Sequence, residues 1–248
     1  MIKFFRLIRQ KLISENKFSK YLFYAIGEIV LVVIGILIAL QINSWYQTRL
    51  DFEKEEKFLL EIKENLNEDL KKINEVISAN AFKLKKIDSA YYYLSLMKEN
   101  PALGKDFSYQ MPVITNHKLF TPTRVAFNNI TSTGKIDILR SDPLRKDISR
   151  YYSDVSLDGV QNQIVSTTQR FLDNVAPKMI NKTMMKFITK KDFDVIAINE
   201  VKVHTDPEIL SGLFVLTNKT FEHNQKLEET KVTIAELIAA IDSYLNSK

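Results

Sequence analysis

An apolar run at residues 24–43 constrains the fold of this chain more than any other feature. The run reads YAIGEIVLVVIGILIALQIN and carries a single charge, on Glu28. A helix of about 20 apolar residues crosses the hydrocarbon core of a bilayer, and the sequence holds no second run of this kind. We therefore predict one transmembrane helix at residues 21–46. It separates a basic N-terminal segment at 1–20 from an outer domain at 47–248.

The positive charge of the chain is concentrated before this helix. The formal net charge is +5, and residues 47–248 are close to neutral. Cytoplasmic flanks of membrane helices are enriched in Lys and Arg, so we expect a cytoplasmic N-terminus and an extracytoplasmic C-terminal domain. A nucleic-acid-binding protein would carry its basic residues on the folded domain, and that class is excluded. The topogenic basic residues are Lys3, Arg6, Arg9, Lys11, Lys17 and Lys20.

The apolar run is predicted to be an uncleaved signal anchor, because no small-residue cleavage site follows it. Aromatic residues flank it on both sides, as interfacial anchors do: Tyr21 and Tyr24 before it, Trp45 and Tyr46 after it. The chain has no cysteine, which excludes disulfides, thiol catalysis and cysteine metal sites.

One face of the predicted membrane helix carries its only acid together with small and polar residues: Glu28, Val32, Gly35, Ala39 and Asn43. Small residues four apart let two helices approach closely, and polar groups can bond across the contact. We expect this face to dock against a second copy of the chain or a partner membrane protein. The alternative is that Glu28, near the cytoplasmic boundary, reaches the interface or pairs with Lys20.

The outer domain is predicted to be all-α. From Leu59 to Leu94, apolar residues recur every three or four positions, which is typical of one long amphipathic helix. This stripe reads 59, 62, 66, 70, 73, 77, 81, 84, 87, 91 and 94. Helices with apolar stripes bury them against one another, so we expect an elongated antiparallel helical bundle. An intermolecular coiled coil is the alternative.

Proline and glycine predict where the later elements begin and end. Residues 105–120 show no helical period and are expected to be an extended loop, with or without a short strand. Thr121-Pro122 is expected to open a short helix that ends at Gly134. Asp142-Pro143 opens a helix with its stripe at 144, 148, 151, 155, 162, 165, 172 and 175, ending or kinking at Pro177. Residues 195–203 are a strand or a loop, and Asp206-Pro207 begins the last helix.

Two stretches resemble an uncharacterised bacterial family of single-pass membrane proteins, classed as a domain of unknown function. The first is the membrane motif GEIVLVVIGILIALQIN at 27–43. The second is AFNNITSTGKID at 126–137, followed by SDPLR at 141–145 and the tyrosine pair 151–152. The resemblance implies an inner-membrane location and a helical outer domain, and it implies no catalytic residue.

No catalytic or phosphate-binding motif occurs in the sequence. His117, His204 and His223 lack metal-site spacing and are expected to be ordinary packing or surface residues. Candidates for a ligand or partner surface are the tyrosines 91–93 and 151–152. Weaker candidates for an anion site are Lys118, Arg124, Lys135 and Arg140.

These patterns favour a non-enzymatic protein, without cofactor or metal, whose outer bundle acts as an interaction or scaffold module. The alternative is an extracytoplasmic sensory or ligand-binding module that signals through a partner membrane protein. Besides the lipid bilayer, the expected partner is a second copy or another membrane protein, and no nucleic acid.

Overall fold

The computed structural model describes residues 18–134, 136–154, 157–179, 189–191 and 202–247, and these residues form helices and connecting segments without a strand. The prediction of an all-α fold is confirmed. The α-helices are α2 (Phe18–Leu96), α3 (Gly104–Ile114), α4 (Val125–Ser132), α5 (Asp142–Asp154), α6 (Asp158–Met179) and α8 (Pro207–Asn246). Short 3-10 turns lie at Pro101–Leu103, Ile136–Ile138 and Val203–Thr205. The chain divides into two compact units, the first ending at Lys57 and the second beginning at Phe58, and α2 belongs to both.

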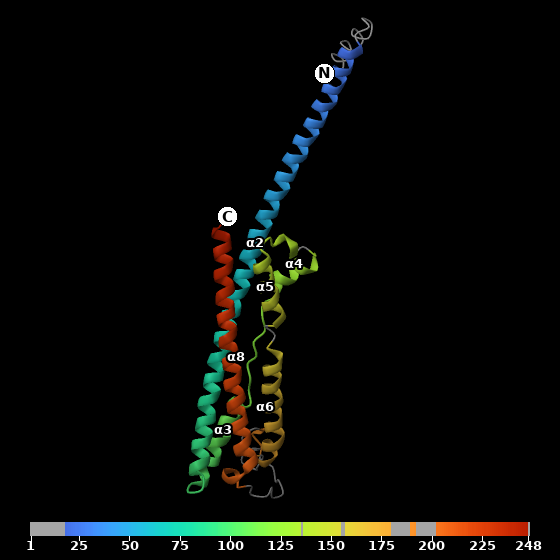
Figure 1. Ribbon diagram of the computed structural model, residues 1–248. Helices are drawn as coiled ribbons and strands as arrows, with labels where there is room; N and C mark the ends of the chain where they lie inside the picture. Colours follow the sequence, from blue (N-terminus) through green and yellow to red (C-terminus); the bar gives the residue numbers. More distant parts are fainter. Residues whose placement is uncertain (1–17, 135, 155–156, 180–188, 192–201, 248) are drawn as a thin grey trace. The chain divides into compact units, whose positions relative to one another are not determined.

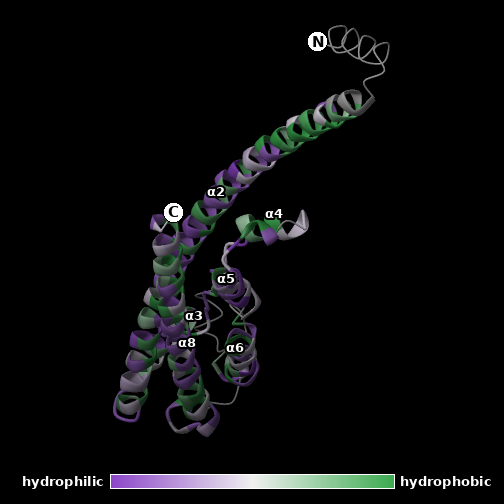
Figure 2. Cartoon of the chain, turned by 45° about the horizontal axis from the view of Figure 1, so that its top comes forward, coloured by the Kyte–Doolittle hydropathy of each residue, from purple (hydrophilic) through white to green (hydrophobic). Residues whose placement is uncertain are grey.

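The first unit contains the N-terminal part of α2. The apolar side chains of α2 from Ile26 to Leu40 are exposed, and the hydropathy colouring in Figure 2 marks this part of the helix as hydrophobic. By length and composition, this is a helix that could cross a membrane. The basic residues before Phe18 lie outside the described residues, as do the side chains of Lys20, Tyr21 and Tyr24.

The sequence-predicted docking face lies on this exposed part of α2. Val32 is 53% exposed, Ala39 and Asn43 are exposed, and Glu28 is half-buried. A Cβ atom added at Gly35 would meet nothing within 4 Å. The expected interfacial residues Trp45 and Tyr46 are also exposed. The face is therefore open in a single chain, and its docking stays a prediction.

The second unit is an antiparallel bundle. Figure 1 shows α2 and α8 running in opposite directions side by side. α5 and α6 follow one another along α8 and both pack against it. Two clusters of buried apolar side chains hold these helices together. One is centred on Leu66, Ile148 and Ile234, and the other on Ile87, Phe171 and Leu213.

The buried positions of α2 and α8 follow an unbroken heptad spacing of alternating three and four residues. After the buried Glu55 and Phe58, they are 59, 62, 66, 69, 73, 76, 80, 83, 87, 90 and 94 on α2, and Met97 just past its end continues the spacing; on α8 they are 209, 213, 216, 220, 223, 227, 230, 234, 237 and 241. The predicted stripe of α2 was wrong by one position at several places, because it followed the apolar Leu70, Ala81 and Leu84 where the buried residues are Asp69, Asn80 and Lys83. The chain itself covers this seam.

The prediction of an extended loop at 105–120 was wrong for its first part, where α3 forms. Phe107, Gln110, Met111 and Ile114 are buried, and their spacing of three, one and three is that of a helix face. Residues 115–124 are not helical, so the second part of the prediction is confirmed. The predicted short helix begins at Val125, later than Thr121, and Gly134 follows it with φ of +65°.

The single helix predicted from Asp142 to Pro177 is two helices. Leu157, between α5 and α6, has φ of +49°, and this left-handed residue resets the register of the stripe. The buried side chains of α6 are consequently Gln161, Ile164, Thr168, Phe171, Val175 and Met179, in place of Asn162, Val165 and Leu172. Pro177 lies in the last turn of α6, and most of the stretch expected as a strand or loop at 195–203 lies outside the described residues.

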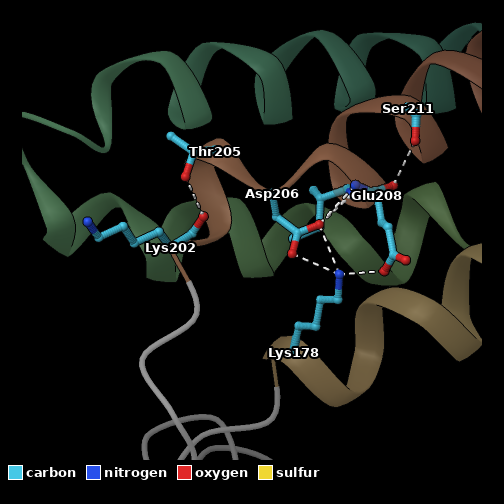
Figure 3. Close-up of polar contacts among 7 residues, drawn as sticks. Lys178, Lys202, Thr205, Asp206, Glu208 and Ser211 are labelled. Atoms are coloured by element: carbon cyan, nitrogen blue, oxygen red, sulfur yellow. Dashed lines mark hydrogen bonds and ion pairs between the residues drawn. The ribbon is translucent and has the colours of Figure 1, made fainter.

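The start of α8 is fixed to the end of α6 by an ion-pair cluster (Figure 3). The Asp206 carboxylate caps α8 by accepting bonds from the backbone N–H groups of Glu208 and Ile209, at 2.9 and 3.2 Å. The Lys178 ammonium of α6 donates to both Asp206 oxygens and to Glu208. The predicted helix start at Asp206-Pro207 is confirmed. Gly212 of α8 packs closely against α6, because a Cβ added there would lie 2.5 Å from Cδ2 of Phe171.

Candidate functional site

Polar side chains replace apolar ones at one level of the bundle, where α2, α6 and α8 meet. Asn80 and Lys83 occupy seam positions of α2, His223 a seam position of α8, and Gln161 the buried face of α6. Each is at most 5% exposed. Buried polar groups are costly unless they are hydrogen-bonded, so the partners of these four residues determine what this level of the bundle can do.

Three of the four form a continuous hydrogen-bond network. The Asn80 amide donates to Nδ1 of His223 (3.1 Å) and to Oδ1 of Asn224 (2.8 Å). Nε2 of His223 lies 3.3 Å from Oε1 of Gln161. Gln161 also accepts from the backbone N–H of Phe120 (2.6 Å) and donates to its carbonyl (3.0 Å). The network links three helices to the extended segment 115–124.

The network also sets the protonation of His223. Its Nδ1 faces an amide N–H and therefore accepts, so the proton of the neutral ring sits on Nε2, facing Gln161. Burial and the nearby positive charge of Lys83 lower the pKa of His223 to about 4. The ring is neutral at neutral pH and acts as a structural connector.

Lys83 is not part of this network, and unlike the residues of the network it carries a positive charge. Its side chain is 3% exposed, and its ammonium donates one hydrogen bond, to the carbonyl of Asn116 at 3.2 Å. Among the described residues, no ion pair joins it to a carboxylate. Burial lowers the pKa of Lys83 to about 8. A nearly buried cation without a counter-charge is costly to stability and typical of functional sites.

Lys83 lines a pocket of about 410 Å³ between α2, the end of α3 and the segment that follows it. Phe82, Pro112 and Val113 form an apolar wall, and Asn80, Asn116, His117 and Lys118 supply polar groups. The volume falls within the range of small-molecule sites, which combine apolar walls with a few polar groups.

The side chains that line this pocket carry a net positive charge. Its lining contains two lysines and no acidic residue. Burial and the charge of Lys83 lower the pKa of His117, and Nδ1 of His117 is a buried atom without a hydrogen-bond partner among the described residues. Lys118 is bound to Glu75 at 2.7 Å, which leaves Lys83 as the lining cation that lacks an ion pair in the part of the chain described.

A buried acid on the α2 seam, Asp69, contrasts with Lys83 because its hydrogen-bonding groups have partners within the chain. It accepts from the Tyr151 hydroxyl and from the backbone N–H of Thr123, both at 2.7 Å. Burial raises its pKa and these bonds oppose the rise. All its bonds are to the chain itself, so Asp69 holds α5 and the extended segment against α2.

The tyrosines that were predicted as candidates for a ligand or partner surface differ in how exposed they are. Tyr151 lies on the predicted stripe and is buried, and Tyr152, which we expected at an exposed edge if its neighbour packs, is buried as well. Tyr91 and Tyr93 pack against the core, while Tyr92 is 61% exposed.

The predicted anion-site residues have separate contacts. Lys118 pairs with Glu75, and the Arg124 guanidinium lies 5.9 Å from the centre of the Tyr152 ring. Lys135 lies outside the described residues.

Sequence reasoning missed Lys83, Asn80 and Gln161. A strict heptad count from Leu59 would have placed residues 80 and 83 on the seam, since the spacing of alternating three and four residues continues through them. His223 was predicted to be an ordinary packing or surface residue, and its burial and hydrogen bonds agree with the packing role. No group of three His, Asp or Glu side chains able to hold a metal ion occurs within the described ranges.

Comparison with known proteins gives one match. Residues 28–203 match the model of a family described as a family of unknown function (DUF6090). No curated protein and no solved structure matches the chain.

Proposed function

Since the chain belongs to the DUF6090 family, for which no function is known, we propose its function from its own geometry. The protein is a single-pass membrane protein whose outer bundle binds a small ligand and acts on a partner membrane protein. The pocket beside the buried Lys83 is the observation that carries this proposal. The geometry thus favours the sensory alternative over the interaction module that the sequence favours.

The membrane location rests on the exposed apolar part of α2 and on the basic residues before it. In this proposal residues 1–20 lie in the cytoplasm and the bundle lies on the periplasmic side of the inner membrane. Because the chain has no cysteine, single substitutions Lys11→Cys and Lys98→Cys report the topology. A membrane-impermeant maleimide applied to intact cells with a permeable outer membrane should label the second variant only. Labelling of the first alone would refute this orientation.

The ligand-binding role has a direct test on the full chain in lipid nanodiscs. A panel of small metabolites is screened for an upward shift of the thermal unfolding temperature of the outer bundle, because a ligand that binds only the folded state stabilises it. Ala79→Phe fills the pocket and should abolish any shift. Ser78→Phe, on the exposed neighbouring position of α2, is the matched control and should keep it. Shifts that persist in Ala79→Phe would remove this pocket from the proposal.

The site is proposed to bind and not to catalyse. Nucleophile and acid–base pairs need two groups within hydrogen-bond reach. Neither Lys83 nor His117 is paired with a carboxylate among the described residues.

The route to a partner is the docking face of the membrane helix, with Glu28, Gly35, Ala39 and Asn43 on one side. Single cysteines introduced one at a time from residue 28 to 46 are oxidised in intact cells. Dimer bands that peak at 28, 35, 39 and 43 support self-association, and heavier bands at those positions support a thiol-bearing partner. Bands that peak on the opposite face would refute the predicted side.

An interaction module is the second candidate, and one observation favours it. α8 carries exposed apolar side chains that share one face of the helix: Leu210, Phe214, Phe221 and Val232. Phe214 and Phe221 are 61% and 56% exposed. Exposed apolar patches of this kind mark protein contacts. If this face binds a partner protein, Phe214→Ser with Phe221→Ser should release that partner from affinity-purified material, without changing the unfolding temperature of the free chain by more than a few degrees.

A further inference from the structure

We infer that the pocket beside Lys83 binds a small organic carboxylate, with its charged head at the Lys83 ammonium and its apolar body against Phe82 and Val113. This inference rests on the proposed function and names the chemical class of the ligand. It follows from three properties of the pocket: its unmatched charge, its available donors and the nature of its walls.

The positive charge of the pocket favours an anionic ligand. Lys83 is nearly buried, and its one hydrogen bond is to a neutral carbonyl. The other lysine that lines the pocket, Lys118, already has a counter-charge in Glu75. A buried ion is stable when it is paired and hydrogen-bonded, so an incoming carboxylate would supply the missing partner.

The available donors suit a carboxylate head. An ammonium carries three N–H donors, and the Asn116 carbonyl accepts one of them. His117 lines the same pocket, is neutral at neutral pH, and has an unpartnered buried Nδ1 among the described residues. A neutral imidazole presents one N–H donor, which a second carboxylate oxygen can accept. Charge-assisted bonds of this kind are the stronger ones.

The walls limit the rest of the ligand. Phe82, Pro112, Val113 and Ala79 present carbon to the pocket, so the body of the ligand should be apolar and small enough for about 410 Å³. One buried cation without an ion pair balances one negative charge, which favours a monocarboxylate over a phosphate dianion.

The test uses benzoate and its neutral isostere benzamide as probes, with the full chain in nanodiscs. Binding is followed through the methyl resonances of Val113, so that only occupation of this pocket counts. Benzoate should bind roughly tenfold more tightly than benzamide, and Lys83→Met should weaken benzoate binding by about tenfold or more, because a charge-assisted bond is lost. Lys85→Met, which removes an exposed lysine of the same helix outside the pocket lining, is the matched control and should change it by less than about threefold.

The outcomes separate this inference from the proposed function. Equal binding of benzoate and benzamide, or unchanged benzoate binding in Lys83→Met, would overturn the carboxylate class while leaving a ligand pocket. Stronger perturbation of Val113 by inorganic phosphate than by benzoate would also overturn it. If no compound, charged or neutral, perturbs Val113, both proposals fail. The comparison of benzoate with benzamide needs no variant and decides the matter even if Lys83→Met does not fold.

Discussion

Replacing Lys83 by Met should make the protein more stable at neutral pH, although it removes a buried hydrogen bond. Burial lowers the pKa of Lys83 from 10.5 to about 8. One pKa unit corresponds to about 1.4 kcal/mol, so keeping the ammonium charged costs the folded state about 3 kcal/mol below pH 8. The lost bond to the Asn116 carbonyl, 3.2 Å long, returns about 1 kcal/mol of that gain. The expected net stabilisation is about 2 kcal/mol at pH 7.

The pH dependence identifies the cause. Between pH 8 and 10.5 the unfolded chain binds a proton at Lys83 that the folded chain does not, so wild-type stability rises with pH in this window. Methionine does not titrate. The advantage of the variant should therefore shrink from pH 7 to pH 10 and should reverse above pH 10.5, where only the lost hydrogen bond remains.

Urea unfolding of the full chain in nanodiscs, followed by far-UV circular dichroism at several pH values, measures this difference. Lys85→Met, on the exposed face of the same helix, is the control and should change the free energy of unfolding by less than about 0.5 kcal/mol. A variant at Lys83 that is less stable than wild type at pH 7, or an advantage that does not change with pH, would refute the reasoning.

Three further predictions concern the bundle itself. His223, with its pKa lowered from 6.5 to about 4, should make stability fall by about 3 kcal/mol as pH drops from 6.5 to 4; His223→Gln should flatten this part of a stability-against-pH curve, and an unchanged slope would contradict the assignment. Gly212→Ala should lower the free energy of unfolding by about 1–3 kcal/mol because its methyl would collide with the buried Phe171 ring, whereas Gly159→Ala, with open space around it, should raise it by about 0.5 kcal/mol; equal effects in urea titrations would refute the packing argument. Asp206→Ala should cost about 1–2 kcal/mol through the lost cap of α8, and Asp206→Asn, which keeps a capping oxygen, should cost less in the same assay.

Apolar periodicity was sufficient to predict the long helices α2 and α8 but not the site. The stripe of α8 and the long helix α2 follow from residues such as Ile209, Leu213 and Ile234, because burial of apolar area dominates folding. The same rule places Lys83 and Asn80 on the surface, since a lone lysine in a sequence normally belongs to solvent. Only the neighbouring helices decide that these positions are covered.

Local backbone geometry accounts for the other differences. At the break between α5 and α6, Leu157 has a left-handed conformation that a leucine rarely adopts. Ser156, Asp158 and Gly159 beside it are turn-forming residues, but the apolar positions on either side keep a helical spacing, so the stretch was predicted as one helix. α3 was missed because its buried face is short and contains the polar Gln110, and because Pro112 lies inside the helix; both weaken the helical pattern. Tertiary contacts stabilise both features, and a single sequence does not encode those contacts in any local pattern.

The pairing of Asn80 with His223 determines how this bundle can move. If α8 slid along α2 by one heptad, His223 would come opposite Ile87 or Ile73, and the amide and the imidazole would be buried without partners. Where Asn80 and His223 pair, the two helices are therefore expected to move as one rigid body. Sliding of α8 along the axis of α2 is disfavoured. Any displacement on ligand binding is expected in the segment that carries Asn116 and His117.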